Sequence, residues 1–523
     1  MPSSGASLGA PVLADAMMRV LISQVSLMRL PLPASFAGLQ FDNSYARLPE
    51  RFFSRVDPTA VANPALIKVN HVLAHELGLD PLVLESSEGA HFLAGNALPT
   101  GAEPIAQAYS GHQFGHLNPR LGDGRAILLG EVIDRNGIRH DIQLKGPGRT
   151  PYSRSGDGRA ALGPVLREYL VSEAMFYLGI KTTRTLAAGT TGQPVYRDTA
   201  LPGAVLTRVA TSHIRVGTFE FFRVREDQEG LKILADHVIQ RHYPEAFAAE
   251  NPYLALLEMV MHAQASLVAS WLHVGFIHGV MNTDNMTVSG DTIDYGPCEF
   301  MDAYEPTTVF SSIDREGRYA YGNQGPIALW NLTRFAECLL PLLDKNLDDA
   351  VAIAEAALGN FSDIFNDYWL VGMRKKIGLI RSLPGDEALI AKFLQILRDE
   401  HADFTLAFRY LVDCVTASAE SHPLLKSCEA LTPWLNRWHI RLAQESRDAE
   451  SIAEQMRKVN PLYIPRNQNV ENVLQAAVEE GNYQPFEELL SVLSRPFEEQ
   501  PGKDLFAKSP PPPEQPYKTF CGT

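Results

Sequence analysis

The residues best suited to chemistry lie in one segment, which begins at His278 and ends at Pro297. Asp284 and Asn285 are adjacent, and Asp294 follows just before a Tyr-Gly-Pro sequence. Carboxylate and amide oxygens, completed by phosphate oxygens and water, are ligands that suit Mg²⁺ or Mn²⁺ better than zinc. Asn285 and Asp294 are therefore candidate metal ligands. Asp284 is a candidate general base, because its carboxylate can accept a proton beside that metal.

A short hairpin is expected to bring the two candidate ligands together. Residues 286–288 and 292–293 are predicted strands, and the Ser-Gly-Asp sequence at 289–291 is a predicted turn between them. Asn285 precedes the first strand and Asp294 follows the second. The hairpin should therefore bring the side chains of both candidate ligands to the same point.

The spacing also matches the metal-binding half of a protein-kinase active site, which has His-Arg-Asp, four residues, Asn and, after a strand pair, Asp-Phe-Gly. On this template His278 matches the His, Asn285 the metal-binding Asn and Asp294 the last Asp. Val280 occupies the position of the kinase base and cannot accept a proton. Asp284, four residues further on, is the displaced candidate. His278 is expected to stiffen the loop through hydrogen bonds rather than to take part in chemistry.

A candidate phosphate-binding lysine precedes this segment. Apolar residues at 126–133 and 138–145 flank an Asp-Arg-Asn-Gly sequence at 134–137, which predicts a β-hairpin with Lys145 at its end. Helical periodicity then places Glu168 on an amphipathic helix. Such a strand lysine and helix glutamate form the phosphate-orienting ion pair of kinases, although a buried structural ion pair has the same residue types.

The string Gly-Asp-Gly-Arg occurs twice, at 122–125 and at 156–159, on either side of Lys145. Glycines let backbone N–H groups approach an anion, and an adjacent arginine can add a bidentate phosphate contact. Either string alone is more typical of a tight turn. Two of them flanking a strand lysine favour a polyphosphate cradle.

Two further cations, Arg208 and Arg215, lie between the candidate lysine and the catalytic segment. On an unbroken strand their spacing of seven would point them to opposite faces. Both can contact one nucleotide only if the chain turns near Ser212. Isolated arginines are usually solvated, so their role depends on the other motifs.

The remaining elements suggest a sheet-containing N-terminal half and a helical C-terminal half. Apolar periodicity predicts a long helix at 252–275 that leads into the His278 loop, and helices continue to about residue 495. Residues 64–78 also have helical spacing and are expected to belong to an ordered N-terminal cap. The predicted segments are a disordered or mis-started extension at 1–35, a cap and N-lobe at 36–215, a C-lobe at 216–435, a helical region at 436–500 and a Pro-rich tail at 501–523.

Composition fits a large cytoplasmic enzyme. A net charge of −15 disfavours nonspecific nucleic-acid binding, because the phosphate backbone would be repelled. The five cysteines form no Cys-x-x-Cys pair. No apolar run reaches about 18 residues, so no membrane partner is expected, and residues 1–35 lack a secretory signal, although weak organelle targeting stays open. The sequence gives no indication of the oligomeric state.

These features together resemble the selenoprotein O family, and the resemblance extends from Phe41 to the C-terminus. The motifs that carry it are Phe41-Asp-Asn-Ser-Tyr45, Ser110-Gly-His-Gln-Phe-Gly115, Leu121-Gly-Asp-Gly-Arg125, Gln143-Leu-Lys-Gly146, Ser155-Gly-Asp-Gly-Arg159, the segment from His278 to Asn285, and Asp294-Tyr-Gly-Pro297. The resemblance implies an α+β, bilobal, protein-kinase-like fold with an N-terminal cap and additional C-terminal helices. It also implies protein adenylylation, in which AMP passes from ATP to a hydroxyl side chain of a protein.

The resemblance further implies a role for each matching position. It implies that ATP is bound in reversed orientation by Gly122, Gly124, Arg125, Lys145, Asp157, Gly158, Arg208, Arg215 and Asp294. It assigns Mg²⁺ or Mn²⁺ to Asn285 and Asp294, and proton acceptance to Asp284. Family members often end in a redox-active Cys or selenocysteine, and Cys521 occupies that place. No obvious cysteine partner is found for it, because residues 307–312, after Asp294, read Thr-Thr-Val-Phe-Ser-Ser. A redox switch and a solvated tail thiol are both open for Cys521.

Three alternatives remain at this stage. The chain can be a kinase-type phosphotransferase, a UMP transferase that uses UTP, or a nucleotide-binding scaffold without catalysis. The intact set of Asp284, Asn285 and Asp294 argues against the scaffold, because a protein that only binds nucleotide needs no base.

Overall fold

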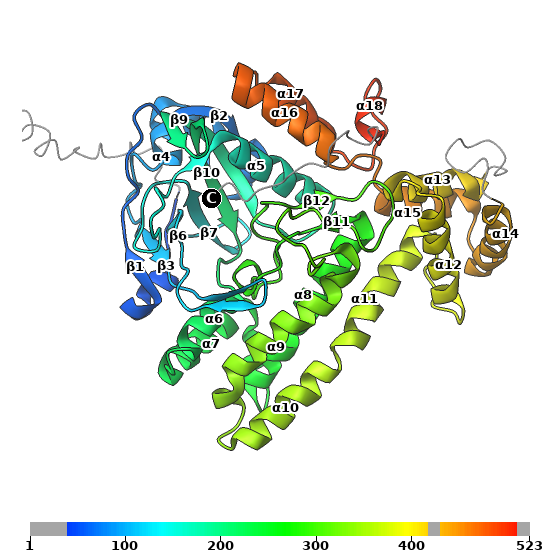
Figure 1. Cartoon of the computed structure of the whole chain (residues 1–523), viewed down its shortest axis with the longest axis horizontal. Coiled ribbons are helices and arrows are strands. Elements are labelled where there is room, and N and C mark those ends of the chain that lie inside the picture. The colour runs from blue at the N-terminus through cyan, green and yellow to red at the C-terminus, as the bar shows by residue number, and fades with distance from the viewer. Residues whose placement is uncertain (1–38, 417–428, 510–523) are drawn as a thin grey trace, which may run out of the picture.

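The computed structural model describes residues 39–416 and 429–509, and it combines helices with antiparallel strands (Figure 1). The α+β class expected from the sequence is therefore confirmed. The predicted extension at 1–35 and Cys521 in the Pro-rich tail lie outside the described residues.

The main sheet has the strand order β1-β3-β6-β7-β10-β9-β2, with the short β8 paired to β10, and its neighbouring strands are antiparallel. Its strands are β1 (Phe53–Arg55), β2 (Ala65–Val69), β3 (Ile105–Gln107), β6 (Ala126–Ile133), β7 (Arg139–Lys145), β8 (Ala160–Ala161), β9 (Arg184–Tyr196) and β10 (Ala200–Ala210). The predicted hairpin is confirmed by β6 and β7, whose turn contains Gly137 at φ 80°. Lys145 is the last residue of β7, as expected.

Helices cover both faces of this sheet. Successive strand residues point to opposite sides, and apolar side chains on each side pack against helices. Val205 and Val209 of β10 pack into the core under α2 (His71–Glu76), α3 (Pro81–Leu84) and α4 (Ser87–Leu93). Ala204 and Leu206 pack on the other side, against α5 (Leu162–Tyr177). The helix predicted to carry Glu168 is α5, and it lies directly on the sheet.

The helical prediction for residues 64–78 is wrong in its first half. Residues Ala65–Val69 form β2, which pairs with β9 at the sheet edge. Helix α2 begins only at His71, where the Asn70 side chain caps its N-terminus. A short apolar pattern fits a strand as well as a helix, and pairing with β9 decides the outcome.

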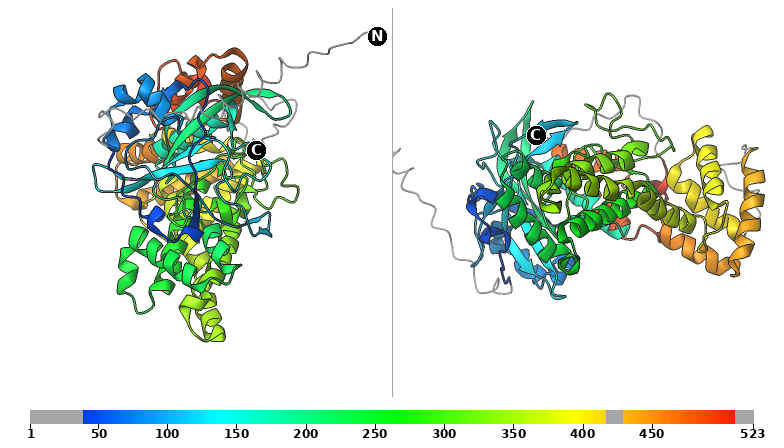
Figure 2. Two further views of the ribbon diagram at one scale, coloured as in Figure 1. Left: turned by 90° about the vertical axis from the view of Figure 1, so that its left-hand side faces the viewer. Right: turned by 90° about the horizontal axis from the view of Figure 1, so that it is seen from below.

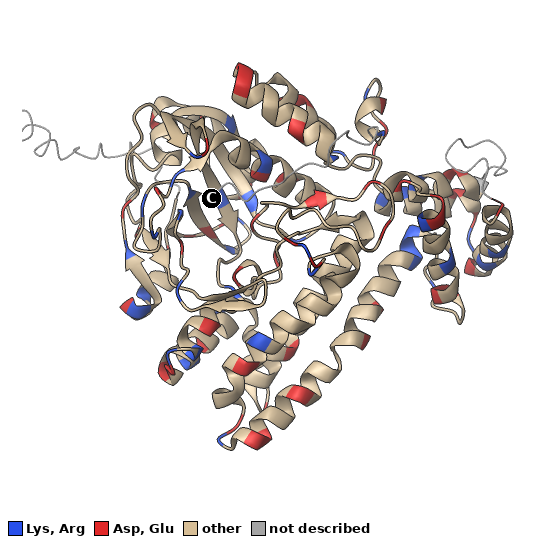
Figure 3. Ribbon diagram, viewed as in Figure 1, with Lys and Arg blue, Asp and Glu red and all other residues tan. Residues whose placement is uncertain are grey.

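The second half of the chain is mainly helical. Its helices are α6 (Val216–Arg223), α7 (Gln228–His242), α8 (Pro252–Val274), α9 (Gln324–Leu343), α10 (Leu347–Gly359), α11 (Phe361–Lys376), α12 (Asp386–Asp399), α13 (Phe404–Thr416), α14 (Leu431–Leu442), α15 (Ala449–Val459), α16 (Asn467–Glu480), α17 (Gln484–Leu493) and α18 (Asp504–Ala507). Acidic and basic residues are interspersed along these helices (Figure 3).

The long helix predicted at 252–275 is confirmed by α8. Asn251 caps its start, and Gly275 at φ 75° ends it. Among the described residues α8 alone is long and apolar enough to cross a membrane by length and composition, a test that buried core helices also pass. Residues such as Leu256 and Val260 on α8 are fully enclosed in the core that α8 shares with α9 and α10.

The C-terminal helices occupy two separate places. Helices α12 to α15 form their own core with α11 at the end of the molecule remote from the sheet (Figures 1 and 2). Helices α16 and α17 return to the sheet end and pack on α5 (Figure 1). The end of the described chain therefore supports the helix that carries Glu168.

Candidate active site

A buried cluster of charges lies where β7, β10 and α5 meet. The ammonium of Lys145 forms one ion pair with Glu168 and a second with Asp294, at 3.2 Å from Nζ to Oδ1. Arg208 donates from Nε to Oε1 of Glu168 at 2.7 Å and from Nη1 to Gln143 at 3.1 Å. Arg208 of β10 lies opposite Gln143 of β7 in the antiparallel ladder. Its side chain is therefore on the same face of the sheet as that of Lys145. One carboxylate on α5 therefore orients two cations of the sheet.

Asp294 is an ionised carboxylate within this cluster. Burial by itself would raise the pKa of Asp294, but the charges of Lys145, Arg125 and Arg208 outweigh it and hold that pKa well below its usual range. Its backbone is in the left-handed region, at φ 67°. Non-glycine residues in that conformation are uncommon and often belong to functional sites.

The loop that precedes Asp294 is held by His278 and Asn285. His278 is buried, and its Nε2 donates to the carbonyl of Ile293 at 2.9 Å while its Nδ1 accepts from the amide of Val280 at 3.3 Å. Asn285 donates from Nδ2 to the carbonyl of Val280 at 3.0 Å. The amide nitrogen is thereby occupied, which leaves Oδ1 as the atom of Asn285 that suits a cation.

The hairpin predicted between Asn285 and Asp294 is not formed. The chain around Thr287 pairs with residues 214–216 instead, and Thr292 pairs with Thr182. The turn between them is closed by a side chain, because the hydroxyl of Thr287 donates to the carbonyl of Asp291 at 2.7 Å. The backbone groups that the prediction paired with each other find partners in more distant segments.

Asp284 lies in a confined position next to Asn285. Its Oδ1 atom is enclosed and has no hydrogen-bond partner within the described residues. Burial raises the pKa of Asp284 to about 7, and the negative charges of Asp294 and Glu220 act in the same direction. A carboxylate with a pKa near neutrality can both accept and release a proton.

The first Gly-Asp-Gly-Arg string forms a tight loop before β6. Gly122 is at φ 72°, and a Cβ there would lie 2.3 Å from the ring of Tyr152. The hydroxyl of Thr150 donates to the carbonyl of Asp123 at 2.6 Å. Arg125 at the end of the loop is close enough to lower the pKa of Asp294.

The second string packs beside the first. The amide of Gly146 donates to the carbonyl of Arg125 at 2.8 Å, and the amide of Gly148 donates to that of Gly158 at 3.1 Å. Both glycine loops therefore flank the chain that leaves Lys145. The side chain of Asp157, however, pairs with Arg197 at 2.9 Å.

The arginine of the second string also has its partners outside the charge cluster. Arg159 donates to the carbonyls of Thr59 and Ala60, at 3.1 and 3.4 Å. The two strings are thus brought together, but the side chains of the second one hold the loop rather than face the charge cluster.

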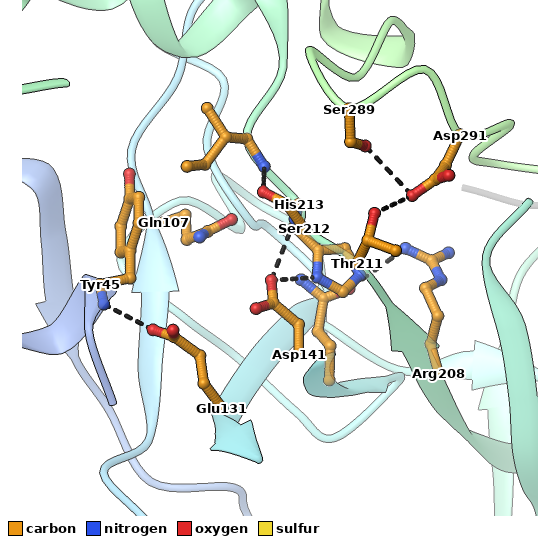
Figure 4. A network of polar contacts seen from close by, with 12 residues as sticks. Tyr45, Gln107, Glu131, Asp141, Arg208, Thr211, Ser212, His213, Ser289 and Asp291 are labelled. Carbon is orange, nitrogen blue, oxygen red and sulfur yellow. Dashed lines mark hydrogen bonds and ion pairs between the residues drawn. The ribbon is translucent and has the colours of Figure 1, made fainter. Parts of the chain in front are cut away.

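The chain turns directly after β10, which ends at Ala210. Figure 4 shows Asp141 and Asp291 on either side of the bend. Asp141 accepts from the amide of His213 at 3.0 Å and from its Nδ1 at 2.8 Å, while Asp291 accepts from Thr211. The chain therefore makes the turn near Ser212 that Arg208 and Arg215 need in order to contact one nucleotide.

Arg215 follows this bend and faces the first loop. Its guanidinium stacks over the ring of Tyr109, 4.3 Å from the centroid, and its Nη2 is 4.0 Å from Oδ1 of Asp123. Nε donates to the carbonyl of His213 at 3.1 Å. The bend thus directs Arg215 toward the loop that carries Gly122.

Several residues of the site carried no functional prediction, although some had a signal in the sequence. Asp123 is buried inside the first Gly-Asp-Gly-Arg string, and Glu220 is an acid within a Phe-Glu-Phe-Phe run of α6. A charge among apolar neighbours indicates a buried, partnered group. Arg167, next to Glu168, donates to the carbonyls of Gly296 and Cys298 in the segment after Asp294. Tyr109 showed no such signal.

Relatives that are similar over almost their whole length are protein nucleotidyltransferases. The chain is 60% identical over 486 residues to "Protein nucleotidyltransferase YdiU" of Rhodopseudomonas palustris (strain BisB18), covering 92% of this chain and 99% of the relative. Identity to the protein of the same name from Bradyrhizobium sp. (strain BTAi1 / ATCC BAA-1182) is 59% over 485 residues, with the same coverage. That from Rhizobium meliloti (strain 1021) is 59% identical over 489 residues, 93% of this chain and 100% of the relative. The protein is therefore a nucleotidyltransferase.

The family is equally clear. A sequence model described as "Protein adenylyltransferase SelO" matches residues 35–494. The chain belongs to this family, which confirms the selenoprotein O resemblance found in its motifs.

Proposed function

We propose that this nucleotidyltransferase transfers AMP from ATP to hydroxyl side chains (Ser, Thr or Tyr) of proteins, with Mg²⁺ or Mn²⁺ as cofactor. The observation that carries the proposal is the position of Asp284, an enclosed carboxylate with a pKa of about 7. It stands beside Asn285, whereas Val280 fills the place of the base in a kinase. A displaced base suits attack on a phosphorus other than the terminal one.

The fold that supports this function is a bilobal, protein-kinase-like one. Lys145 at the end of a central strand pairs with Glu168 on the helix that covers the sheet. The long helix α8 leads into the loop of His278, and Asp294 closes the cluster through its contact with Lys145. These are the relative positions of the nucleotide-binding parts in a kinase.

The residues present fit a divalent cation. Asp294 is held ionised by its cationic neighbours, and the hydrogen bond from Nδ2 of Asn285 to Val280 leaves its oxygen as the ligand atom. Within residues 39–416 and 429–509 no group of three or more His, Cys, Asp or Glu side chains could hold a metal. Asn285 and Asp294 would therefore hold the ion together with phosphate oxygens and water, as is usual for Mg²⁺. Bound there, the cation would supply charge neutralisation at the phosphates.

The reaction assigns a separate task to each group of residues. The substrate hydroxyl loses its proton to the carboxylate of Asp284 as its oxygen bonds to the α-phosphorus of ATP. The bond from the α-phosphorus to the bridging oxygen breaks, and pyrophosphate leaves. With ATP reversed relative to a kinase, Lys145, Arg125 and Arg215 lie on the side of the leaving pyrophosphate. Positioning and charge neutralisation provide most of the rate enhancement in such transfers.

The test uses ATP labelled at either the α- or the γ-phosphate. Purified protein is incubated with a hydroxyl-bearing protein substrate and each metal, with UTP in a parallel series. Label transferred from the α position, with pyrophosphate released, supports adenylylation. Label transferred only from the γ position would make the protein a kinase, and transfer only from UTP would make it a UMP transferase. An Asp294→Ala variant controls for adventitious labelling.

A further inference from the structure

The motif Ser110-Gly-His-Gln-Phe-Gly115 forms a small hairpin outside the main sheet. Its strands are β4 (Gly111–Gln113) and β5 (His116–Asn118). The hairpin lies against the turn Thr283–Asn285, which contains Asp284, and α6 packs against both. The amide of Ser110 donates to the carbonyl of Gly217 in α6 at 2.9 Å.

A buried carboxylate joins these three elements. Oε2 of Glu220, on α6, accepts from the hydroxyl of Thr283 at 2.6 Å, and Oε1 is 2.5 Å from Nδ1 of His112. The hydroxyl of Thr283 accepts in turn from the amide of His112 at 2.7 Å. Glu220, His112 and Thr283 therefore form a closed triangle, and Glu220 is only 3% exposed. Thr283 immediately precedes Asp284.

The residue before Thr283 is fixed by the same hairpin. Oδ1 of Asn282 accepts from the amide of Phe114 at 3.0 Å and from the hydroxyl of Tyr319 at 2.7 Å. The carbonyl of Asn282 accepts from the amide of Asn285 at 2.9 Å. The loop is thereby held on the N-terminal side of Asp284 by contacts to β4, its turn and α6.

Gly111 sets the position of the carboxylate itself. A Cβ at this residue would lie 2.3 Å from Oδ1 of Asp284 and 2.8 Å from Cδ1 of Leu121. Contacts under 3.0 Å force a shift, so any larger residue here would displace the Asp284 carboxylate. The backbone of Gly111 is that of an ordinary strand, and the requirement for glycine therefore comes from space alone.

We propose that Glu220 and Gly111 are positioning residues for Asp284: Glu220 fixes the loop through Thr283, and Gly111 provides the space in which the carboxylate sits. This inference rests on the proposed function, in which Asp284 accepts the proton of the substrate hydroxyl. A base must lie within hydrogen-bond reach of that proton, and a displacement of about 1 Å can cost about 10²-fold in rate. Among the contacts of the described residues, none joins Glu220 or Gly111 to the buried cluster of charges around Lys145.

The experiment compares Gly111→Ala, Glu220→Ala and Glu220→Gln with the matched control Gly359→Ala. Gly359 is helical, and a Cβ there meets nothing within 4 Å. We expect Gly111→Ala and Glu220→Ala to lower kcat for AMP transfer by about 10- to 100-fold while the Kd for ATP stays within about twofold of wild type. Glu220→Gln should restore part of kcat, because an amide can accept from Thr283 and donate to His112. Gly359→Ala should match wild type.

A double-mutant cycle separates positioning of Asp284 from a general structural role. In an Asp284→Asn background, Glu220→Ala and Gly111→Ala should lower the residual rate by less than about twofold, because no base remains to be positioned. Equal losses in both backgrounds, or a fall in ATP affinity parallel to kcat, would overturn the inference. Gly111→Ala keeps the test decisive even if Glu220→Ala fails to fold, since it leaves the triangle intact.

The outcome for wild-type protein distinguishes the two proposals. If wild type transfers no AMP, the proposed function fails, whatever the variants do. If wild type transfers AMP and the Gly111 and Glu220 variants retain its kcat, only the positioning inference fails.

Discussion

Glu168 on α5 forms an ion pair with Lys145 at the end of β7, 23 residues earlier in the sequence, and accepts a hydrogen bond from its ammonium. The same carboxylate accepts from Arg208 on its other oxygen. Burial alone would raise the pKa of Glu168, but Arg208 and Lys145 outweigh it and lower that pKa. Glu168 thus pairs with two buried cations, and Asp294 supplies the second negative charge through its ion pair with Lys145.

Glu168→Gln should destabilise the protein and inactivate it. The amide cannot balance Lys145 and Arg208, and breaking a buried ion pair costs about 3–5 kcal/mol. Urea unfolding measures the free energy of unfolding, and pyrophosphate release measures activity. Glu454→Gln is the control, because the pair of Glu454 with Lys458 is exposed on both sides. An unchanged unfolding midpoint for Glu168→Gln would contradict the assignment.

Asp294→Ala and Asp284→Ala should differ in which step they remove. Loss of Asp294 removes the ionised carboxylate beside Lys145, and metal-dependent transfer should fall by at least about 10³-fold, with weaker metal–nucleotide binding. Loss of Asp284 leaves that cluster intact, so nucleotide affinity should persist while turnover slows. Isothermal titration with metal and ATP, together with single-turnover rates, separates the two. Equal loss of ATP affinity in both variants would count against a proton-transfer role for Asp284.

Gly122→Ala should weaken nucleotide binding through the shape of the first loop. A Cβ at Gly122 would lie 2.3 Å from the Tyr152 ring, in a backbone at φ 72°. The strain is of order 1–3 kcal/mol. Because the free loop can relieve it by leaving the binding conformation, the Kd for ATP should rise by about 5- to 150-fold. Gly163→Ala is the control, since its Cβ would meet only Val478 at 3.7 Å. Equal affinities for the two variants would remove Gly122 from the binding loop.

The sequence predicted those parts of the fold and site that depend on local patterns. The Asn-Gly turn and the alternation around it are local signals for β6 and β7, and helical periodicity is a local signal for α5. The positions of Lys145 and Glu168 could therefore be derived. Strand β2 could not, because its assignment depends on pairing with β9, which lies more than a hundred residues further along the chain.

The triangle of Glu220, His112 and Thr283 could not be predicted from local sequence patterns either. Glu220 lies 108 residues from His112 and 63 from Thr283. Nothing in the spacing of these residues predicts that they meet. The predicted hairpin before Asp294 failed for the same reason, since the chain around Thr287 and Thr292 pairs with residues 214–216 and 181–183.

Arg167→Lys should loosen the contact between α5 and the segment that follows Asp294. The guanidinium donates to Gly296 at 3.0 Å, to Cys298 at 2.6 Å and to Glu471 on α16 at 2.8 Å. An ammonium cannot reproduce this planar fork, so we expect a loss of about 1–3 kcal/mol in the free energy of unfolding and lower activity. Glu471→Gln keeps an acceptor for the same fork and should have a smaller effect. Urea unfolding and pyrophosphate release provide the measurements, and a lysine variant with wild-type values would exclude this role.

Glu299→Gln should change how stability depends on pH. Glu299 in β12 (Glu299–Phe300) is 5% exposed, and its Oε1 has no hydrogen-bond partner among the described residues. Burial raises the pKa of Glu299 from its ordinary 4.5 to about 8, with Arg167 opposing that rise. Between these two values the folded protein keeps a proton that the unfolded chain releases. Stability should therefore fall as pH rises through this window, by at most about 1.4 kcal/mol per pH unit from this residue.

The glutamine variant carries no such proton, so its stability relative to wild type should increase steadily from pH 5 to pH 8 and level off above. Urea unfolding of both proteins at several pH values gives the difference directly, because the other titrating groups cancel. A difference that stays constant across the window would mean that Glu299 is ionised in the folded protein, paired with Arg167 rather than neutral.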